Sequence, residues 1–77
     1  MVPEMGSQPS TIAITLNGEP RSIPSGQTLL DLLRSLDLDP ERVAVELDRQ
    51  IAKRPVWSER VLDEGARIEI VQFVGGG

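Results

Sequence analysis

Three short stretches of the chain alternate apolar and polar residues, and each predicts a β-strand. In residues 11–16 and 43–47, every second side chain is isoleucine, leucine or valine. Residues 67–74 begin with the same alternation and end in a more continuous apolar run. Because successive side chains of a strand point to opposite faces, this alternation predicts strands with one buried face.

Turn-forming residues predict how the first strand continues. Asn17-Gly18 follows it directly and is typical of a two-residue hairpin turn, because both central positions of such a turn take positive φ. Residues 21–23 are the predicted return strand. Pro20 and Pro24 are expected to keep this strand short, because proline has no backbone N–H to donate to a sheet.

A stripe of leucines predicts one main helix. The stripe repeats at the i, i+3, i+4, i+7 spacing of a single helical face, and Leu30 widens it. Thr28 is the expected N-cap, and the carboxylate of Asp31 complements the helix N-terminus. The stripe itself consists of Leu29, Leu32, Leu33 and Leu36.

The segments after the helix predict shorter elements. Asp39-Pro40 predicts a single helical turn, with aspartate as the cap and proline at the first helical position. Asp48-Arg49 predicts a turn after the third strand, and residues 50–52 predict a short fourth strand. Trp57 is interpreted as a packing anchor, because the residues around it are apolar.

The order strand, strand, helix, strand, short strand, strand predicts an α+β fold. A mixed sheet of four to five strands would carry one main helix packed on one face. This order matches the β-grasp, or ubiquitin-like, fold, in which the first and last strands pair at the centre of the sheet. We expect residues 1–10 to be a disordered N-terminal leader, residues 11–74 the β-grasp domain and residues 75–77 a flexible glycine tail.

The composition argues against several classes of function. The chain has no cysteine and no histidine, so it offers no disulfide, no thiolate metal site and no side chain that ordinarily titrates near neutral pH. Its net charge of −4, from 12 acidic and 8 basic residues, argues against a nucleic-acid binder. The sequence shows neither a long apolar run nor a signal-peptide pattern, so we expect no membrane association and a cytoplasmic location.

The glycine tail and the strand before it are the candidate functional site. Gly75, Gly76 and Gly77 are thin enough to enter a partner's active site, and the group they would present is the Gly77 carboxylate. A linker or a frayed end is the alternative interpretation. Val71 and Phe73 fall on the strand face opposite the predicted helix, beside the tail.

An exposed apolar patch next to the tail is typical of a docking surface. We therefore expect Val71 and Phe73, with Ala44 from the third strand, to dock partners. Two alternatives remain open at this point. A β-bulge could reverse the register of the last strand, or a loop could cover its end.

Four segments carry a resemblance to a known family. They are ITLNGEP at 14–20, TLLDLL at 28–33, VAVEL at 43–47 and IEIVQFVGGG at 68–77. Over residues 12–77 the sequence resembles the ThiS family, the sulfur carrier proteins of thiamine biosynthesis. Asp48-Arg49 departs from the Asn-Gly that many relatives carry at that turn.

The resemblance implies a carrier on which partner enzymes act, and it adds no catalytic residue or bound cofactor to this chain. A ThiF-like adenylyltransferase would use ATP and magnesium to adenylate Gly77, with Gly76 as its partner in the Gly-Gly motif and Gly75 as an extra glycine. A persulfide sulfurtransferase would convert the adenylate to a thiocarboxylate. Thiazole synthase (ThiG-like) would then place the sulfur in the thiazole ring.

Three other functions remain open on the sequence. The small subunit of molybdopterin synthase shares the fold and the tail, but its relatives usually carry prolines before the last glycines, whereas this chain has Val-Gln-Phe-Val. A ubiquitin-like modifier would join its last glycine to a lysine of a target protein. A TGS-like regulatory or RNA-binding module would need no terminal Gly-Gly.

Overall fold

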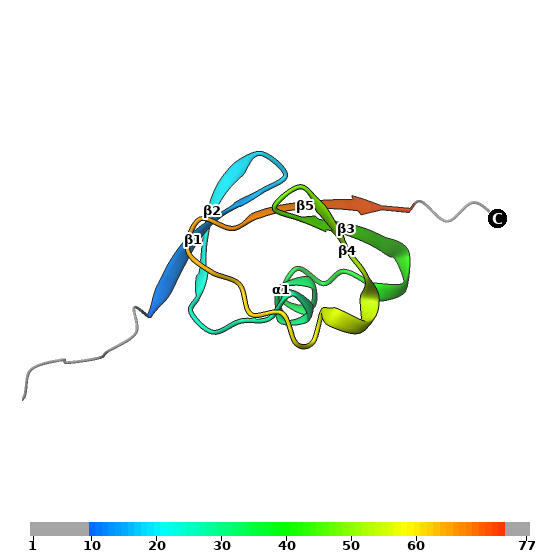
Figure 1. The fold of residues 1–77 in the computed structure, drawn as a ribbon, viewed down its shortest axis with the longest axis horizontal. Coiled ribbons are helices and arrows are strands. Elements are labelled where there is room, and N and C mark those ends of the chain that lie inside the picture. Colours follow the sequence, from blue (N-terminus) through cyan, green and yellow to red (C-terminus); the bar gives the residue numbers. More distant parts are fainter. Residues whose placement is uncertain (1–9, 74–77) are drawn as a thin grey trace, which may run out of the picture.

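A single five-stranded mixed sheet with one helix on one of its faces makes up the protein (Figure 1). This computed structural model describes residues 10–73. The strands are ordered β2-β1-β5-β3-β4 across the sheet, and the predicted α+β, β-grasp arrangement is confirmed. The elements are β1 (Thr11–Leu16), β2 (Glu19–Pro24), α1 (Leu29–Ser35), β3 (Val43–Leu47), β4 (Gln50–Ala52) and β5 (Arg67–Gln72), with 3₁₀ turns at Pro40–Arg42 and Arg54–Val56.

Strand β5 lies at the centre of the sheet, between β1 and β3. It pairs with β1 in parallel over two rungs only, Thr15 with Arg67 and Leu16 with Ile68. Its antiparallel pairing with β3 is longer and continues without a break to the pair of Val43 and Gln72. Strand β5 is therefore paired with β1 only at its beginning and with β3 from Ile68 to Gln72.

The hydrophobic core lies between the sheet and α1. Three of the four leucines of the stripe are buried as predicted, whereas the fourth, Leu36, and the neighbouring Leu30 are partly buried. Trp57 is 3% exposed, and its indole Nε1–H donates to the Ala52 carbonyl oxygen at 2.8 Å. The tryptophan is thus confirmed as a packing anchor. Residues with no measurable exposure are Leu29, Leu32, Leu33 and Ile68.

Helix α1 begins with a complete capping box. The Asp31 backbone N–H donates to the Thr28 hydroxyl oxygen at 3.1 Å, and the Thr28 backbone N–H donates to Asp31 Oδ2 at 3.0 Å. The hydrogen bond from the Thr28 backbone to its carboxylate, assisted by the Thr28 side chain, lowers the pKa of Asp31. Because a helix this short is marginal alone, the cap and the buried leucine stripe together hold it.

Strand β2 is longer than predicted, and this expectation was wrong. It runs from Glu19 to Pro24 and includes both prolines that were expected to limit it. Pro20 lies opposite Thr15 and Pro24 opposite Thr11, at positions where the β2 backbone points away from β1. Because β2 is an edge strand, the missing N–H of each proline removes no bond of the sheet.

Most other predicted elements are confirmed within residues 10–73. Both hairpin turns carry positive φ at their two central residues, 49° and 83° at Asn17-Gly18 and 51° and 70° at Asp48-Arg49. The departure from Asn-Gly at the second turn therefore leaves its geometry intact. Strand β5 is described as far as Gln72, not Val74. Residues 1–9 of the expected leader, the end of the expected domain at residue 74 and the expected tail at 75–77 lie outside the described residues. Ser10 is described, and its carbonyl oxygen accepts from the Ser25 N–H at 3.0 Å.

Replacing Leu32 with alanine tests the account of the core. Leu32 is fully buried, so we expect Leu32→Ala to lower the free energy of unfolding by about 2–5 kcal/mol. The control is Ile51→Ala, because Ile51 is 77% exposed and its loss should change stability by no more than about 0.5 kcal/mol. Urea unfolding followed by tryptophan fluorescence measures both, and equal losses would contradict the assigned core.

Candidate functional site

The face of β5 that points away from α1 becomes apolar toward the end of the strand. Ile68 is buried beneath the helix and Ile70 packs against the core. Val71 and Phe73 lie on the other side and are 60% and 53% exposed. Since the pairing with β3 is continuous through this region, no bulge reverses the register. Within residues 10–73, no loop buries these two side chains, so this part of the chain supports neither alternative to an exposed patch.

Residues from two neighbouring strands extend this exposed apolar surface. Ala44 lies directly opposite Val71 in the β3–β5 ladder and is exposed, as predicted. Ile51 on β4 lies opposite Glu46 and is 77% exposed. Ala44, Ile51 and Val71 line a shallow hollow of about 210 Å³. We refer to Ala44, Ile51, Val71 and Phe73 as the apolar patch.

Sequence reasoning missed Ile51 as a member of this patch. The residue was assigned to a short fourth strand, but no face was assigned to it. The signal was present in the turn: a two-residue hairpin at Asp48-Arg49 pairs Gln50 with Leu47 and therefore Ile51 with Glu46. That register places the isoleucine on the face away from the helix.

Two glutamates at opposed positions of β3 and β5 adjoin the apolar patch. Glu46 on β3 is paired directly with Glu69 on β5, and both side chains are exposed and help to line the hollow. Like charges at opposed positions of a sheet are unfavourable. Among the described residues the one recorded ion pair joins Arg42 and Asp39, so neither glutamate is neutralised within residues 10–73. The surface therefore combines apolar contact with unneutralised negative charge.

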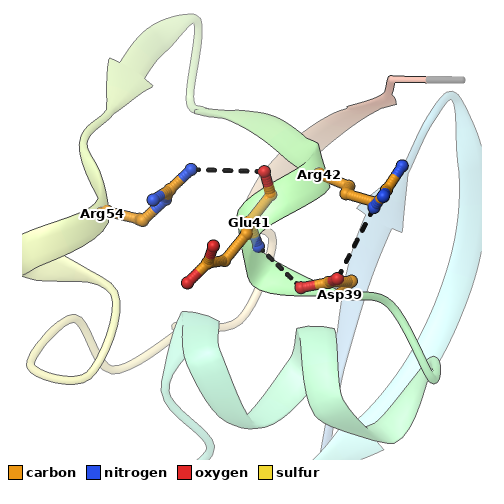
Figure 2. Close-up of polar contacts among 4 residues, drawn as sticks. All are labelled: Asp39, Glu41, Arg42 and Arg54. Carbon is orange, nitrogen blue, oxygen red and sulfur yellow. Dashed lines mark hydrogen bonds and ion pairs between the residues drawn. The ribbon is translucent and has the colours of Figure 1, made fainter. Parts of the chain in front are cut away.

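The end of β5 is anchored on the segment that precedes β3. The Phe73 backbone N–H donates to the Arg42 carbonyl oxygen at 2.7 Å. Figure 2 shows how that segment is fixed: Asp39 Oδ1 accepts from the Glu41 backbone N–H at 2.9 Å, and Asp39 Oδ2 lies 3.8 Å from Arg42 Nε. Arg54 Nη2 also donates to the Glu41 carbonyl oxygen at 3.4 Å. These contacts hold Phe73, the last residue that the structure describes, against the segment that precedes β3.

The predicted reactive residues lie beyond the described part of the chain. Gly75, Gly76 and Gly77 fall in the 74–77 segment, so their role stays a prediction. Within residues 10–73, no group of three or more acidic, histidine or cysteine side chains is arranged to hold a metal ion. No helix in this part of the chain is long and apolar enough to cross a membrane.

Comparison with known proteins identifies the family. The profile of the ThiS family matches residues 14–77, which include most of the sheet, the helix and the glycine tail. The chain belongs to the ThiS family. The match extends through all three glycines, so the tail is part of what the family shares with this chain.

Individual relatives agree with membership of the ThiS family. The sulfur carrier protein ThiS of Escherichia coli is 30% identical over 64 residues, which are 83% of this chain and 97% of that protein. The crystal structure of the thiamine biosynthesis protein ThiS from Geobacter metallireducens superimposes with a TM-score of 0.74 at 28% identity. That comparison covers 86% of this chain and 100% of the Geobacter chain.

A longer relative also contains a ThiS-like segment. The thiazole synthase of Magnetococcus marinus is 45% identical to this chain over 64 residues, which are 83% of this chain. These residues amount to 20% of the thiazole synthase, so the chain spans about a fifth of the length of that relative. A unit of the ThiS family thus occurs in one polypeptide with a larger part that this chain does not match.

Proposed function

We propose that this member of the ThiS family is a sulfur carrier protein whose reactive group is the carboxylate of Gly77. The observation that carries the proposal is the match of the ThiS family through residue 77, on a fold whose central strand leads directly toward the glycines. In this proposal the domain presents the Gly77 carboxylate, and partner enzymes catalyse its reactions. The chain is accordingly a protein substrate and not an enzyme.

The proposed reaction sequence begins with activation by ATP. A ThiF-like adenylyltransferase with magnesium catalyses attack of a Gly77 carboxylate oxygen on the α-phosphorus of ATP, which gives an acyl-adenylate and releases pyrophosphate. The terminal sulfur of a persulfide sulfurtransferase then attacks the acyl carbon and displaces AMP. Reductive cleavage of the resulting acyl disulfide by a thiol leaves the thiocarboxylate on Gly77.

The composition and the surface support this division of labour. A chain without histidine or cysteine supplies neither an ordinary general base nor a nucleophilic thiol, whereas a carrier needs neither. The apolar patch lies on β3, β4 and the end of β5, the strand that precedes the tail in the sequence, and its exposure supports a docking role. Ala44, Val71 and Phe73 are the proposed docking residues, and Ile51 joins them.

Thiazole synthase is the proposed acceptor of the sulfur. Support comes from the Magnetococcus marinus relative of that name, one fifth of which matches this chain. In the proposed last step, a ThiG-like enzyme takes the sulfur of the thiocarboxylate into the thiazole ring of thiamine. With these partners we propose a cytoplasmic location, and no step of the proposed reaction sequence requires nucleic acid or a membrane.

Intact mass spectrometry tests the proposed modification. The chain is incubated with a ThiF-like adenylyltransferase, ATP, magnesium and a persulfide donor, and we expect the mass change that corresponds to replacement of one oxygen by sulfur. Fragmentation should place the sulfur on Gly77. An unchanged mass with an adenylyltransferase that modifies the Escherichia coli relative would contradict the proposal. Capture by molybdopterin synthase in place of thiazole synthase would assign the carrier to a different pathway.

The substitution Phe73→Asp tests the apolar patch. Because Phe73 is 53% exposed, we expect the thermal midpoint of the variant to stay near that of the wild type. Affinity for the adenylyltransferase should fall by roughly tenfold or more, since a charge replaces an apolar contact. Val61→Asp is the matched control. Val61 is exposed to a similar degree, 49%, but it lies outside the apolar patch and pairs with Thr28 beside the helix. A thermal midpoint that collapses in Phe73→Asp would instead place the residue in the core.

A further inference from the structure

The side chain of Asn17 makes two hydrogen bonds to the backbone of β5 that its place in a hairpin turn does not require. The Ile70 backbone N–H donates to Asn17 Oδ1 at 2.7 Å. Asn17 Nδ2 donates in return to the Ile70 carbonyl oxygen at 3.3 Å. One amide side chain therefore satisfies both the donor and the acceptor of a single residue 53 positions further along the chain.

These bonds occupy the place where a further rung of the parallel ladder would lie. The Thr15 N–H donates to the Ala66 carbonyl and the Asn17 N–H donates to the Ile68 carbonyl, at 2.9 and 2.8 Å. In a parallel pair, alternate residues of one strand bond to the same neighbour, so the next residue of β5 that faces β1 is Ile70. Strand β1 ends at Leu16, so the Asn17 side chain makes the hydrogen bonds to Ile70 that the backbone of a longer β1 would make.

The other side of β5 is paired further along the strand. Phe73 bonds to Arg42, and the alternation of bonded pairs places Ile70 and Gln72 with their N–H and C=O groups turned away from β3. In the described part of the chain, the Asn17 amide is the last recorded contact on the β1 side. Past Ile70, β5 is held by β3 alone.

A matching contact at the beginning of β5 provides an internal comparison. Asp48, in the other hairpin turn, accepts from the Arg67 backbone N–H through Oδ1 at 2.9 Å, and its own N–H donates to the Arg67 carbonyl at 2.8 Å. Asn17 and Asp48 both have positive φ, of 49° and 51°. Two hairpin turns thus bind the central strand, one near its start and one near its exit.

We propose that Asn17 is a positioning residue that fixes the direction in which β5 leaves the sheet. By holding Ile70, the amide keeps Val71 and Phe73 in their positions beside β3, at the end of the described part of β5. The proposal rests on the proposed function, because it assigns the contact to presentation of Gly77. A chain that presents its tail in the correct direction only part of the time binds its partner with an apparent affinity reduced by that fraction.

The test compares Asn17→Gly with Asp48→Gly. Glycine accepts positive φ, so each variant keeps its turn and loses only the side-chain contact. We expect Asn17→Gly to speed amide hydrogen exchange at Ile70 and Phe73 by roughly tenfold, as the loss of a hydrogen-bonded rung predicts, and Asp48→Gly to speed it at Arg67 but not at Phe73. This measurement needs no partner protein, and an unchanged exchange rate at Phe73 in Asn17→Gly would overturn the proposal.

Steady-state kinetics supply the functional arm of the test. With a ThiF-like adenylyltransferase, ATP–pyrophosphate exchange should show a KM for the Asn17→Gly carrier several-fold above that of the wild type, with kcat preserved. Asp48→Gly should keep the wild-type KM. Equal KM values for the two variants would overturn the positioning role. Failure of the wild-type chain to support exchange would instead count against the proposed function, and the amide-exchange arm would still decide the role of Asn17.

Discussion

The structure depends on β5 being held in the middle of the sheet while its last residues remain accessible. The strand pairs with β1 for two rungs and with β3 over five residues, and Ile68 is buried completely beneath α1. The same strand turns Val71 and Phe73 to the opposite face. One face of β5 therefore packs in the core, and its other face carries exposed apolar side chains near the end of the strand. The other elements hold this strand in place: the capped helix covers it, and both hairpin turns bond to it.

This arrangement is consistent with the proposed sulfur transfer, in which the chain needs little chemistry of its own. Within residues 10–73 there is no cluster suited to a metal, and the whole sequence lacks histidine and cysteine. What the fold offers is a surface of apolar contact with an opposed pair of carboxylates, Glu46 and Glu69. A partner that meets this surface with apolar and basic side chains would neutralise the pair on binding.

Local sequence signals predicted most of the fold, and long-range contacts account for what they missed. Each successful prediction depended on residues close together in the sequence, so the sequence pattern was enough to make it. These features are the leucine stripe, the cap at Thr28 and the Asn-Gly turn. The predicted extent of β2 was wrong because a strand tolerates proline where its backbone nitrogen points away from the neighbouring strand. The local sequence does not show that β2 lies at the edge of the sheet. Ile51 and Asn17 were missed as functional residues because their roles arise from pairing with distant strands. The patch at Val71 and Phe73 was predicted because alternation alone assigns its face.

Deletion of Gly76 and Gly77 tests the central claim, that the domain serves to present the end of the tail. The shortened chain and the full chain are compared in ATP–pyrophosphate exchange with a ThiF-like adenylyltransferase, and their thermal midpoints are measured in parallel. The account predicts that exchange is abolished while the thermal midpoint is unchanged, because the core lies within residues 12–68. Full exchange by the shortened chain would contradict it.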